Sequence, residues 1–431
     1  MTAEIAVMNE EAIALAADSA VTGRAKIFTS ANKIFALSKY HPVALMIYDN
    51  AQFLGVPWDT IVKQYRRQLR DDCFPTLQGH AENFLKFLQS SPQLFPPVTE
   101  EQAAGALAYS ICTKIMSEAL ERVDARVKAG EELTEQEIAE QVEDLIARHA
   151  DEWKAAKRRK GLPKNYRKTL QQKYRAVVSA SIERVYRSIA LSTKATRQLR
   201  TLFVEVAMKD MRFEDSATHS GIVIAGFGED DIFPRLRQYH VEGILAGDLV
   251  LTEDEPVEVG LAPGERAWIV PFAQREQVET FMEGIDPHLR MHLHAWWHEK
   301  LDGLVEEVAD KLKLSDAKRA DLTKAFDKRC AEIVHREFEE ALLDFSHANN
   351  VRPIINIVGM LPKDVLAEMA ESLVNLTSFK RRVTPQAETV GGPIDVAVIS
   401  RGDGFIWIKR KHYFDPQLNP QFLANYNREE P

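Results

Sequence analysis

Cysteine is scarce in this sequence, and its spacing is irregular. The 431 residues include three cysteines, Cys73, Cys112 and Cys330. An odd number of thiols this far apart argues against a disulfide framework, and the spacing matches neither a zinc site nor a redox pair. The sequence therefore predicts thiols that are packed in the core and bind no metal.

Long apolar runs, a leader segment and a phosphate-binding loop are also missing. No apolar run approaches the ~20 residues that a membrane-spanning helix needs. The first residues lack the basic and then apolar pattern of a leader, so a cytoplasmic protein is expected. No glycine-rich P-loop occurs, so ATP-driven work would fall to a separate partner chain. The net charge of −9 disfavours nucleic acid as a partner of the whole molecule.

The beginning of the chain predicts a β-hairpin with chemical meaning. Residues 3–8 and 12–18 are small, apolar and β-branched runs separated by an Asn-Glu-Glu turn. With the turn centred on Glu10, residue i lies opposite residue 20 − i. Thr2 is then expected directly across from Asp18, close enough for the two side chains to share a neighbour.

Thr2 becomes the first residue when Met1 is removed, and it then has its own base, the free α-amine, beside its hydroxyl. The first seventy residues resemble a proteasome β subunit, or the similar peptidase ring subunit of the bacterial two-component ATP-dependent protease. The resemblance implies that Thr2 is the nucleophile, that Asp18 holds a lysine, and that Lys33 lowers the proton affinity of the threonine. Lys33 comes one residue short of the family's usual spacing, which leaves Lys26 as a rival.

The same resemblance implies an oxyanion site in the turn that enters the first helix. That turn is formed here by residues 47–50, so the backbone N–H donor is expected at Tyr48 or Asp49. The family has glycine in this turn. Asp and Asn adopt positive φ more readily than most other residues, which makes the turn compatible with this sequence.

Two further acidic residues are relevant to the candidate site. Proteasome subunits have an Asp and, three residues later, a Ser near their last Gly-Gly step, where this chain has Ala387 and Val390. Glu388 or Thr389 is the possible substitute. Glu4 is two residues from Thr2, so it is expected on the same face of the strand, where it could pair with Lys33 or Lys26 and either tune or quench the site.

The resemblance returns at residues 388–408, which are similar to the closing strand pair of proteasome subunits. Ile394, Val396 and Val398 are expected to alternate with more exposed neighbours, and Arg401-Gly-Asp-Gly indicates a hairpin turn. This Arg-Gly-Asp triplet is therefore a turn and not an adhesion motif.

Strand and helix patterns divide the chain into five segments. The core is expected in residues 1–70, 213–285 and 351–431, with helical insertions at 71–212 and 286–350. Within the core, residues 57–69 and 362–374 are expected to be helices that cover a sheet. The core pieces total about 220 residues, which suits one four-layer α-β-β-α sandwich of the N-terminal nucleophile (Ntn) hydrolase type, an α+β fold.

Two other clusters have competing interpretations. His294 and His298 lie one helical turn apart, with His292 and Glu299 nearby, which allows a metal site; an ordinary amphipathic helix is preferred, because no third ligand has a fixed spacing. Residues 154–175 hold ten Lys or Arg and could bind nucleic acid. The preceding residues 121–152 hold eleven Asp or Glu, so a helical pair or a subunit contact could neutralise the basic block.

Together these patterns predict a proteasome-like threonine hydrolase that cleaves peptide or other amide bonds without a metal or organic cofactor. The resemblance also implies a homo-oligomer, with a possible separate ATPase partner. Two alternatives remain: a catalytically silent assembly scaffold or binding module, and a nucleic-acid-associated protein that acts through residues 154–175.

Overall fold

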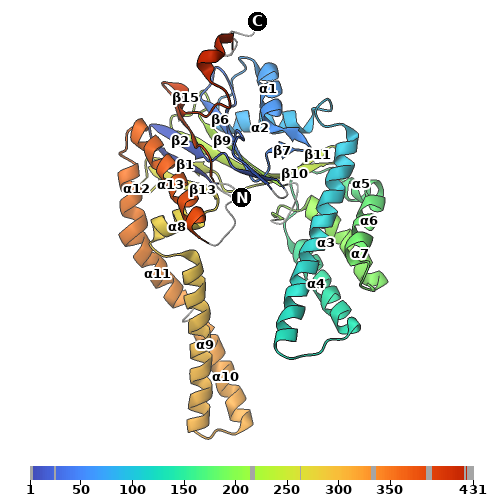
Figure 1. Ribbon diagram of the computed structural model, residues 1–431. Helices are drawn as coiled ribbons and strands as arrows, with labels where there is room; N and C mark the ends of the chain where they lie inside the picture. The colour runs from blue at the N-terminus through green and yellow to red at the C-terminus, as the bar shows by residue number, and fades with distance from the viewer. Residues whose placement is uncertain are drawn as a thin grey trace.

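The computed structural model describes residues 3–23, 26–213, 219–262, 264–331, 336–384, 391–421 and 424. Within these ranges the protein is α+β, with two large antiparallel sheets and many helices around them (Figure 1). None of the helices in the described ranges is long and apolar enough to cross a membrane.

The first large sheet contains both ends of the core. Its strand order is β13-β1-β2-β14-β15, and all of its pairs are antiparallel. The bounds are β1 Glu4–Asn9, β2 Ala12–Ala17, β13 Ala267–Ala273, β14 Asp395–Ser400 and β15 Gly404–Lys409. The N-terminal hairpin therefore lies in the middle of the sheet, between strands from much later in the chain.

The second large sheet has the order β11-β10-β9-β6-β5, with β12 paired to β10. The bounds are β5 Ile34–Ala36, β6 Val43–Tyr48, β9 Ser220–Gly226, β10 Arg235–Leu245, β11 Asp248–Glu253 and β12 Val257–Glu258. Two small hairpins complete the strands: β3 Val21–Gly23 with β4 Lys26–Phe28, and β7 Gln52–Phe53 with β8 Val56–Pro57.

Three apolar clusters hold these sheets and their helices together. One joins the facing sides of the two sheets and includes Met8, Leu15 and Val223. A second packs the other face of the first sheet on α13 (Lys363–Val383), and a third packs the second sheet on α1 (Trp58–Leu69) and α2 (Leu77–Gln89). Full burial of each large apolar side chain contributes about 1.5–3 kcal/mol, so this layering dominates the stability of the core.

Burial on both faces changes the expected pattern of the central strands. Every residue of β1, β2, β6, β9 and β14 is buried. The alternation expected around Val396 and Val398 is therefore wrong, because Ala397 and Ile399 pack between the two sheets while Val396 and Val398 pack toward α13. The Arg401–Gly404 turn forms as the sequence indicates, and Gly404 has φ +73°.

The helices that cover the sheets follow the sequence periodicity. In α1, Ile61, Val62, Tyr65 and Leu69 recur at helical spacing and are all buried. Helix α13 buries Leu366, Ala370 and Leu373 but continues to Val383 instead of ending at Val374. No proline interrupts this helix before Pro385, so the turns after Val374 can form.

Two groups of helices extend from the sheets in the same direction (Figure 1). The first has an apolar core of its own, formed by α3 Pro97–Lys128, α4 Glu135–Ala155, α5 Tyr166–Lys173, α6 Arg175–Tyr186 and α7 Thr193–Met208. The second contains α9 Pro287–Lys311, α10 Asp316–Ala331, α11 Glu339–Ser346 and the π-helical turn η2 His347–Val351. The first group falls within the predicted 71–212 segment, although α2 also lies there and packs on the sheet beside α1. The second group extends one residue beyond the predicted 286–350 segment, to Val351.

The structure describes the side chains of two of the three cysteines, and one of the two differs from the sequence expectation; the side chain of Cys330 is not described. Cys112 is buried in α3, but Cys73 is exposed in the turn after α1, so the prediction of a core thiol is wrong there. This turn carries polar neighbours at the surface and leaves the thiol no apolar layer to enter.

Candidate functional site

The N-terminal hairpin has a register one residue away from the predicted one. Glu4 pairs with Ala17 and Met8 with Ile13, so residue i lies opposite residue 21 − i. Asn9 causes the shift, because its side-chain oxygen accepts hydrogen bonds from the backbone N–H groups of Glu11 (3.0 Å) and Ala12 (3.3 Å) and closes a two-residue turn.

Asp18 therefore lies opposite Ala3 and not opposite Thr2. The backbone N–H of Asp18 donates to the carbonyl oxygen of Ala3 at 3.1 Å, and the N–H of Ala3 donates to Asp18 Oδ1 at 3.1 Å. Thr2 itself lies outside the described residues, as do Glu388 and its neighbours Ala387, Thr389 and Val390. The side chain of Lys26 is not described either.

Lys33 is buried between two carboxylates. Its ammonium contacts Asp18 Oδ1 and lies 3.0 Å from Glu4 Oε1, and only 3% of Lys33 is exposed. The structure thus brings Asp18 and Lys33 together, and Glu4 forms a second ion pair with the same lysine. Removing three charges from water is costly, and these groups tolerate burial because each charge is paired.

Asp18 is also held by the backbone on its other side. Its Oδ2 accepts hydrogen bonds from the N–H groups of Gly391 (2.9 Å) and Ala20 (3.3 Å). Asp18 therefore connects the first strand, the lysine and the segment that leads into β14. A carboxylate with this many donors has little freedom to move.

The predicted oxyanion turn lies at the end of β6, beside Lys33. The carbonyl oxygen of Lys33 accepts a hydrogen bond at 2.9 Å from the N–H of Ile47, the first residue of the predicted turn. Asp49 has φ +66°, the left-handed conformation that the sequence predicts to be possible for Asp or Asn in this turn. The indole N–H of Trp58 donates to Asn50 O at 3.1 Å, which connects the turn to the start of α1.

Tyr48 occupies a space that a glycine in β9 leaves open. A Cβ atom at Gly221 would lie 1.8 Å from the Tyr48 ring, and the ring also stacks on Phe272 of β13 at a centroid distance of 6.0 Å. Burial raises the pKa of the Tyr48 hydroxyl, so the group stays protonated and can donate a hydrogen bond.

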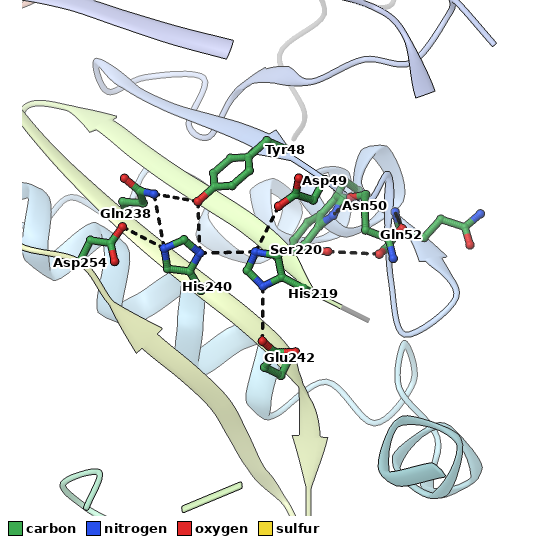
Figure 2. A network of polar contacts seen from close by, with 11 residues as sticks. Tyr48, Asp49, Asn50, Gln52, His219, Ser220, Gln238, His240, Glu242 and Asp254 are labelled. Atoms are coloured by element: carbon green, nitrogen blue, oxygen red, sulfur yellow. Dashed lines mark hydrogen bonds and ion pairs between the residues drawn. The ribbon is translucent and has the colours of Figure 1, made fainter. Parts of the chain in front are cut away.

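A polar network surrounds the side chains of this turn (Figure 2). Gln238 Nε2 donates to the Tyr48 hydroxyl at 2.8 Å, and His240 Nδ1 lies 3.3 Å from the same oxygen. His240 Nε2 lies 2.9 Å from Asp254 Oδ2, and His240 Nδ1 lies 3.4 Å from His219 Nε2.

His219 lies between two carboxylates. Its Nε2 is 3.2 Å from Asp49 Oδ2, and its Nδ1 is 3.4 Å from Glu242 Oε1. Burial disfavours the charged ring, but the hydrogen bonds and charges of Asp49 and Glu242 outweigh burial and raise the pKa of His219. Burial also opposes ionisation of Asp49, while the hydrogen bond from His219 lowers the pKa of Asp49 below its usual value. The two shifts are reciprocal, because the Asp49 carboxylate favours the charged ring and the ring favours the ionised carboxylate.

Sequence reasoning missed this network. Its members are far apart in the chain and become neighbours only when β6, β9 and β10 pair. One signal was present: Gln238, His240 and Glu242 alternate with Tyr239 and Val241, so β10 carries three polar side chains on one face of a strand. A polar face in an otherwise buried strand points to a site.

The other candidate clusters do not form part of this site. Within the described residues, no group of three or more His, Cys, Asp or Glu is arranged to hold a metal ion, which covers the described part of the α9 histidine cluster. In the basic block, Lys173 pairs with Glu100 and Arg167 with Glu205 (2.6 Å), so these partners come from outside residues 121–152. A groove of about 1240 Å³ along β13, α8 (Glu276–Glu283) and α12 (Arg352–Val358) shares no residue with the turn or the lysine.

Comparison of the sequence with protein-family models and with curated proteins finds no match.

Proposed function

We propose that the protein is a proteasome-like N-terminal threonine hydrolase that cleaves peptide or other amide bonds after Met1 is removed. The observation that carries the proposal is the buried pair of Lys33 and Asp18, hydrogen-bonded to the backbone of Ala3, the residue bonded to Thr2. Replacement of a whole buried ion pair by apolar residues is often neutral or stabilising, so retention of this buried group of charges favours a role beyond stability.

The packing of the core supports an Ntn-hydrolase sandwich. Two antiparallel sheets share one apolar cluster, and each packs helices on its other face. The four layers α-β-β-α, with helical insertions at 71–212 and 286–350, account for this arrangement. Active sites of this kind lie at the end of the two sheets, where Lys33 and the turn at Asp49 are neighbours.

The mechanism uses groups of this chain alone. The Thr2 hydroxyl attacks the carbonyl carbon of the substrate, and its proton passes to the Thr2 α-amine. The positive charge of Lys33 lowers the proton affinity of both groups. The backbone N–H of Tyr48 or Asp49 stabilises the oxyanion. The amine leaving group takes the proton, and water then hydrolyses the ester on Thr2, which releases the acid.

One contact favours a second candidate function. Glu4 places an additional negative charge on Lys33, so the cation is shared between two carboxylates. This pairing opposes the effect of Lys33 on Thr2 and would suit a catalytically silent scaffold or binding module with the same fold. Nucleic-acid binding through residues 154–175 is less favoured, because Lys173 and Arg167 are already paired with acidic side chains.

Assembly into a homo-oligomer belongs to the same proposal. Leu376, Phe379 and Val383 lie at i, i+3 and i+7 of α13, with exposed fractions of 43%, 61% and 62%. Such a stripe on the outer helix layer is suited to contact another copy. A separate ATPase chain would supply unfolding of protein substrates.

Intact mass and covalent labelling test the hydrolase proposal. The protein isolated from its native cell should lack Met1, and an electrophilic probe for N-terminal threonine should add its mass once to the wild type and not to Thr2→Ala. A matched Thr22→Ala variant, in which another threonine near the N-terminus is lost, should still be labelled. Retained Met1, or labelling that survives Thr2→Ala, would contradict the proposal.

A further inference from the structure

The turn at the end of β6 is held through its side chains as well as its backbone. The Tyr48 hydroxyl is bonded to Gln238 and His240, and the Asp49 carboxylate to His219. All three partners come from β10 or from the residue before β9, so the turn is braced by the second sheet (Figure 2).

Asp49 needs such a brace because of its backbone conformation. At φ +66° a residue with a Cβ atom is strained, whereas glycine adopts this conformation without cost. An isolated Asp in this position would relax toward negative φ and would move the N–H of the turn. The ion pair to His219 opposes that movement by fixing the carboxylate.

His219 is itself placed firmly enough for this task. It is buried, its ring stacks on His240 at a centroid distance of 5.2 Å, and Glu242 contacts its second nitrogen. Glu242 is itself a buried acid, and its Oε1 lies 3.4 Å from His219 Nδ1, so the imidazole ring contacts a carboxylate on each side. His240 is held in turn by Asp254.

We infer that His219 is a positioning residue: it clamps the Asp49 carboxylate and thereby holds the oxyanion turn in the left-handed conformation that glycine would adopt unaided. The inference rests on the proposed function for its catalytic consequence, because only a hydrolase uses the turn as an oxyanion site. The clamp itself is a property of the fold and exists with or without catalysis.

The clamp depends on the charge of the ring. The groups that face His219 are Asp49 and Tyr48 at the end of β6 and His240 and Glu242 on β10, while Asp254 acts through His240 and Arg212 through its charge on Asp49. Since these acids raise the pKa of His219, the clamp is complete below the ordinary histidine value of about 6.5 and is lost as the pH rises through the higher folded-state value.

Hydrogen exchange tests the clamp without any need for activity. In the full-length protein, His219→Ala should speed exchange of the backbone amides in residues 48–52 by roughly tenfold or more. Adding Asp49→Gly to His219→Ala should return exchange to near the wild-type rate, because glycine keeps the conformation alone. His80→Gln removes a different buried histidine, in α2, and should leave residues 48–52 unchanged.

Labelling of Thr2 tests the catalytic consequence. His219→Ala should slow the reaction with the N-terminal threonine probe roughly 10- to 100-fold, as expected for a misplaced oxyanion donor, and the Asp49→Gly addition should restore most of the rate. In the wild type the rate should decline as the pH rises past the His219 pKa, and this decline should be absent from the double variant.

The outcomes separate the two proposals. Unchanged exchange in His219→Ala, or exchange that Asp49→Gly fails to restore, overturns the clamp whatever the labelling shows. Faster exchange in His219→Ala that Asp49→Gly restores supports the clamp. If the probe also fails to label the wild type, the hydrolase proposal is overturned and the clamp remains supported.

Discussion

Lys33 is the residue on which the charge balance of the candidate site depends. It is the positive partner of both Asp18 and Glu4, and all three side chains are buried. If the ammonium is removed, the carboxylates of Asp18 and Glu4 remain close together without the positive charge that lies between them. Such a pair either stays ionised at high cost or takes up a proton.

Lys33→Met should therefore lower the free energy of unfolding by about 3–5 kcal/mol at neutral pH, the usual cost of leaving a buried charge unpaired. Urea denaturation followed by circular dichroism measures this change. The triple variant Lys33→Met, Asp18→Asn, Glu4→Gln removes every charge and should recover most of the loss. If Lys33→Met alone is neutral, the lysine does not compensate these carboxylates.

The residues that could be predicted from the sequence are those whose role is local. Contact between Asp18 and Lys33 was expected from the resemblance of the first seventy residues, and the structure brings the two side chains together. The residue that lies opposite Asp18 in the hairpin could not be predicted. The register depends on the Asn9 side chain, whose hydrogen bonds select a two-residue turn. Glu4 was expected to reach a lysine, and the structure shows that Lys33 is its partner.

At the level of the element, β9 and β6 fit together only because a glycine faces a tyrosine. Gly221 pairs with Tyr48, and the ring fills the volume that a side chain would need. The strand cannot shift to make room, because its neighbours Ile222 and Val223 are packed in different apolar clusters on its two faces.

Gly221→Ala should therefore destabilise the protein by about 1–3 kcal/mol through overpacking, measured as a lower midpoint of urea unfolding. The matched control is Gly303→Ala in α9, where a Cβ atom meets nothing within 4 Å and alanine favours the helix. The control should be neutral or slightly stabilising. Equal effects in the two variants would mean that the Tyr48 ring has space to move.

Helices and hairpins were easier to predict than the packing around them. Helix α1 and the hairpin of β14 and β15 follow from periodicity and turn residues alone. Burial of Ala397 and Ile399 in β14 could not be predicted, and neither could the polar face of β10. Both depend on contacts with segments that are distant in the sequence. A periodicity within one strand indicates which residues share a face, but it does not indicate what covers each face.

At the level of the whole molecule, the apolar stripe on α13 is the most direct indication of a further contact. Phe379 lies at its centre with 61% of its surface exposed, next to basic side chains in the last turns of the helix. One charged residue in such a stripe would lose its hydration on assembly and would interrupt the apolar contact.

Phe379→Asp should therefore shift the protein toward smaller species in analytical ultracentrifugation, with a dissociation constant raised roughly 30-fold or more, as expected for a contact worth at least 2 kcal/mol. The control Leu120→Asp changes a comparably exposed apolar residue of α3 and should leave the distribution unchanged. A monomeric wild type, or an unchanged distribution in Phe379→Asp, would contradict assembly through this stripe.

The bond from Gly391 to Asp18 also determines when the site can exist. The two residues are 373 positions apart, and β2 gains its second neighbour only when β14 has been synthesised. Since a ribosome adds about 5–20 residues per second, this gap of 373 residues corresponds to roughly 20–75 s between the first strands and their last partner. If the protein is the proposed hydrolase, a nascent chain with a free N-terminal threonine would therefore be unable to cleave neighbouring chains on the polysome until translation of the core is almost complete.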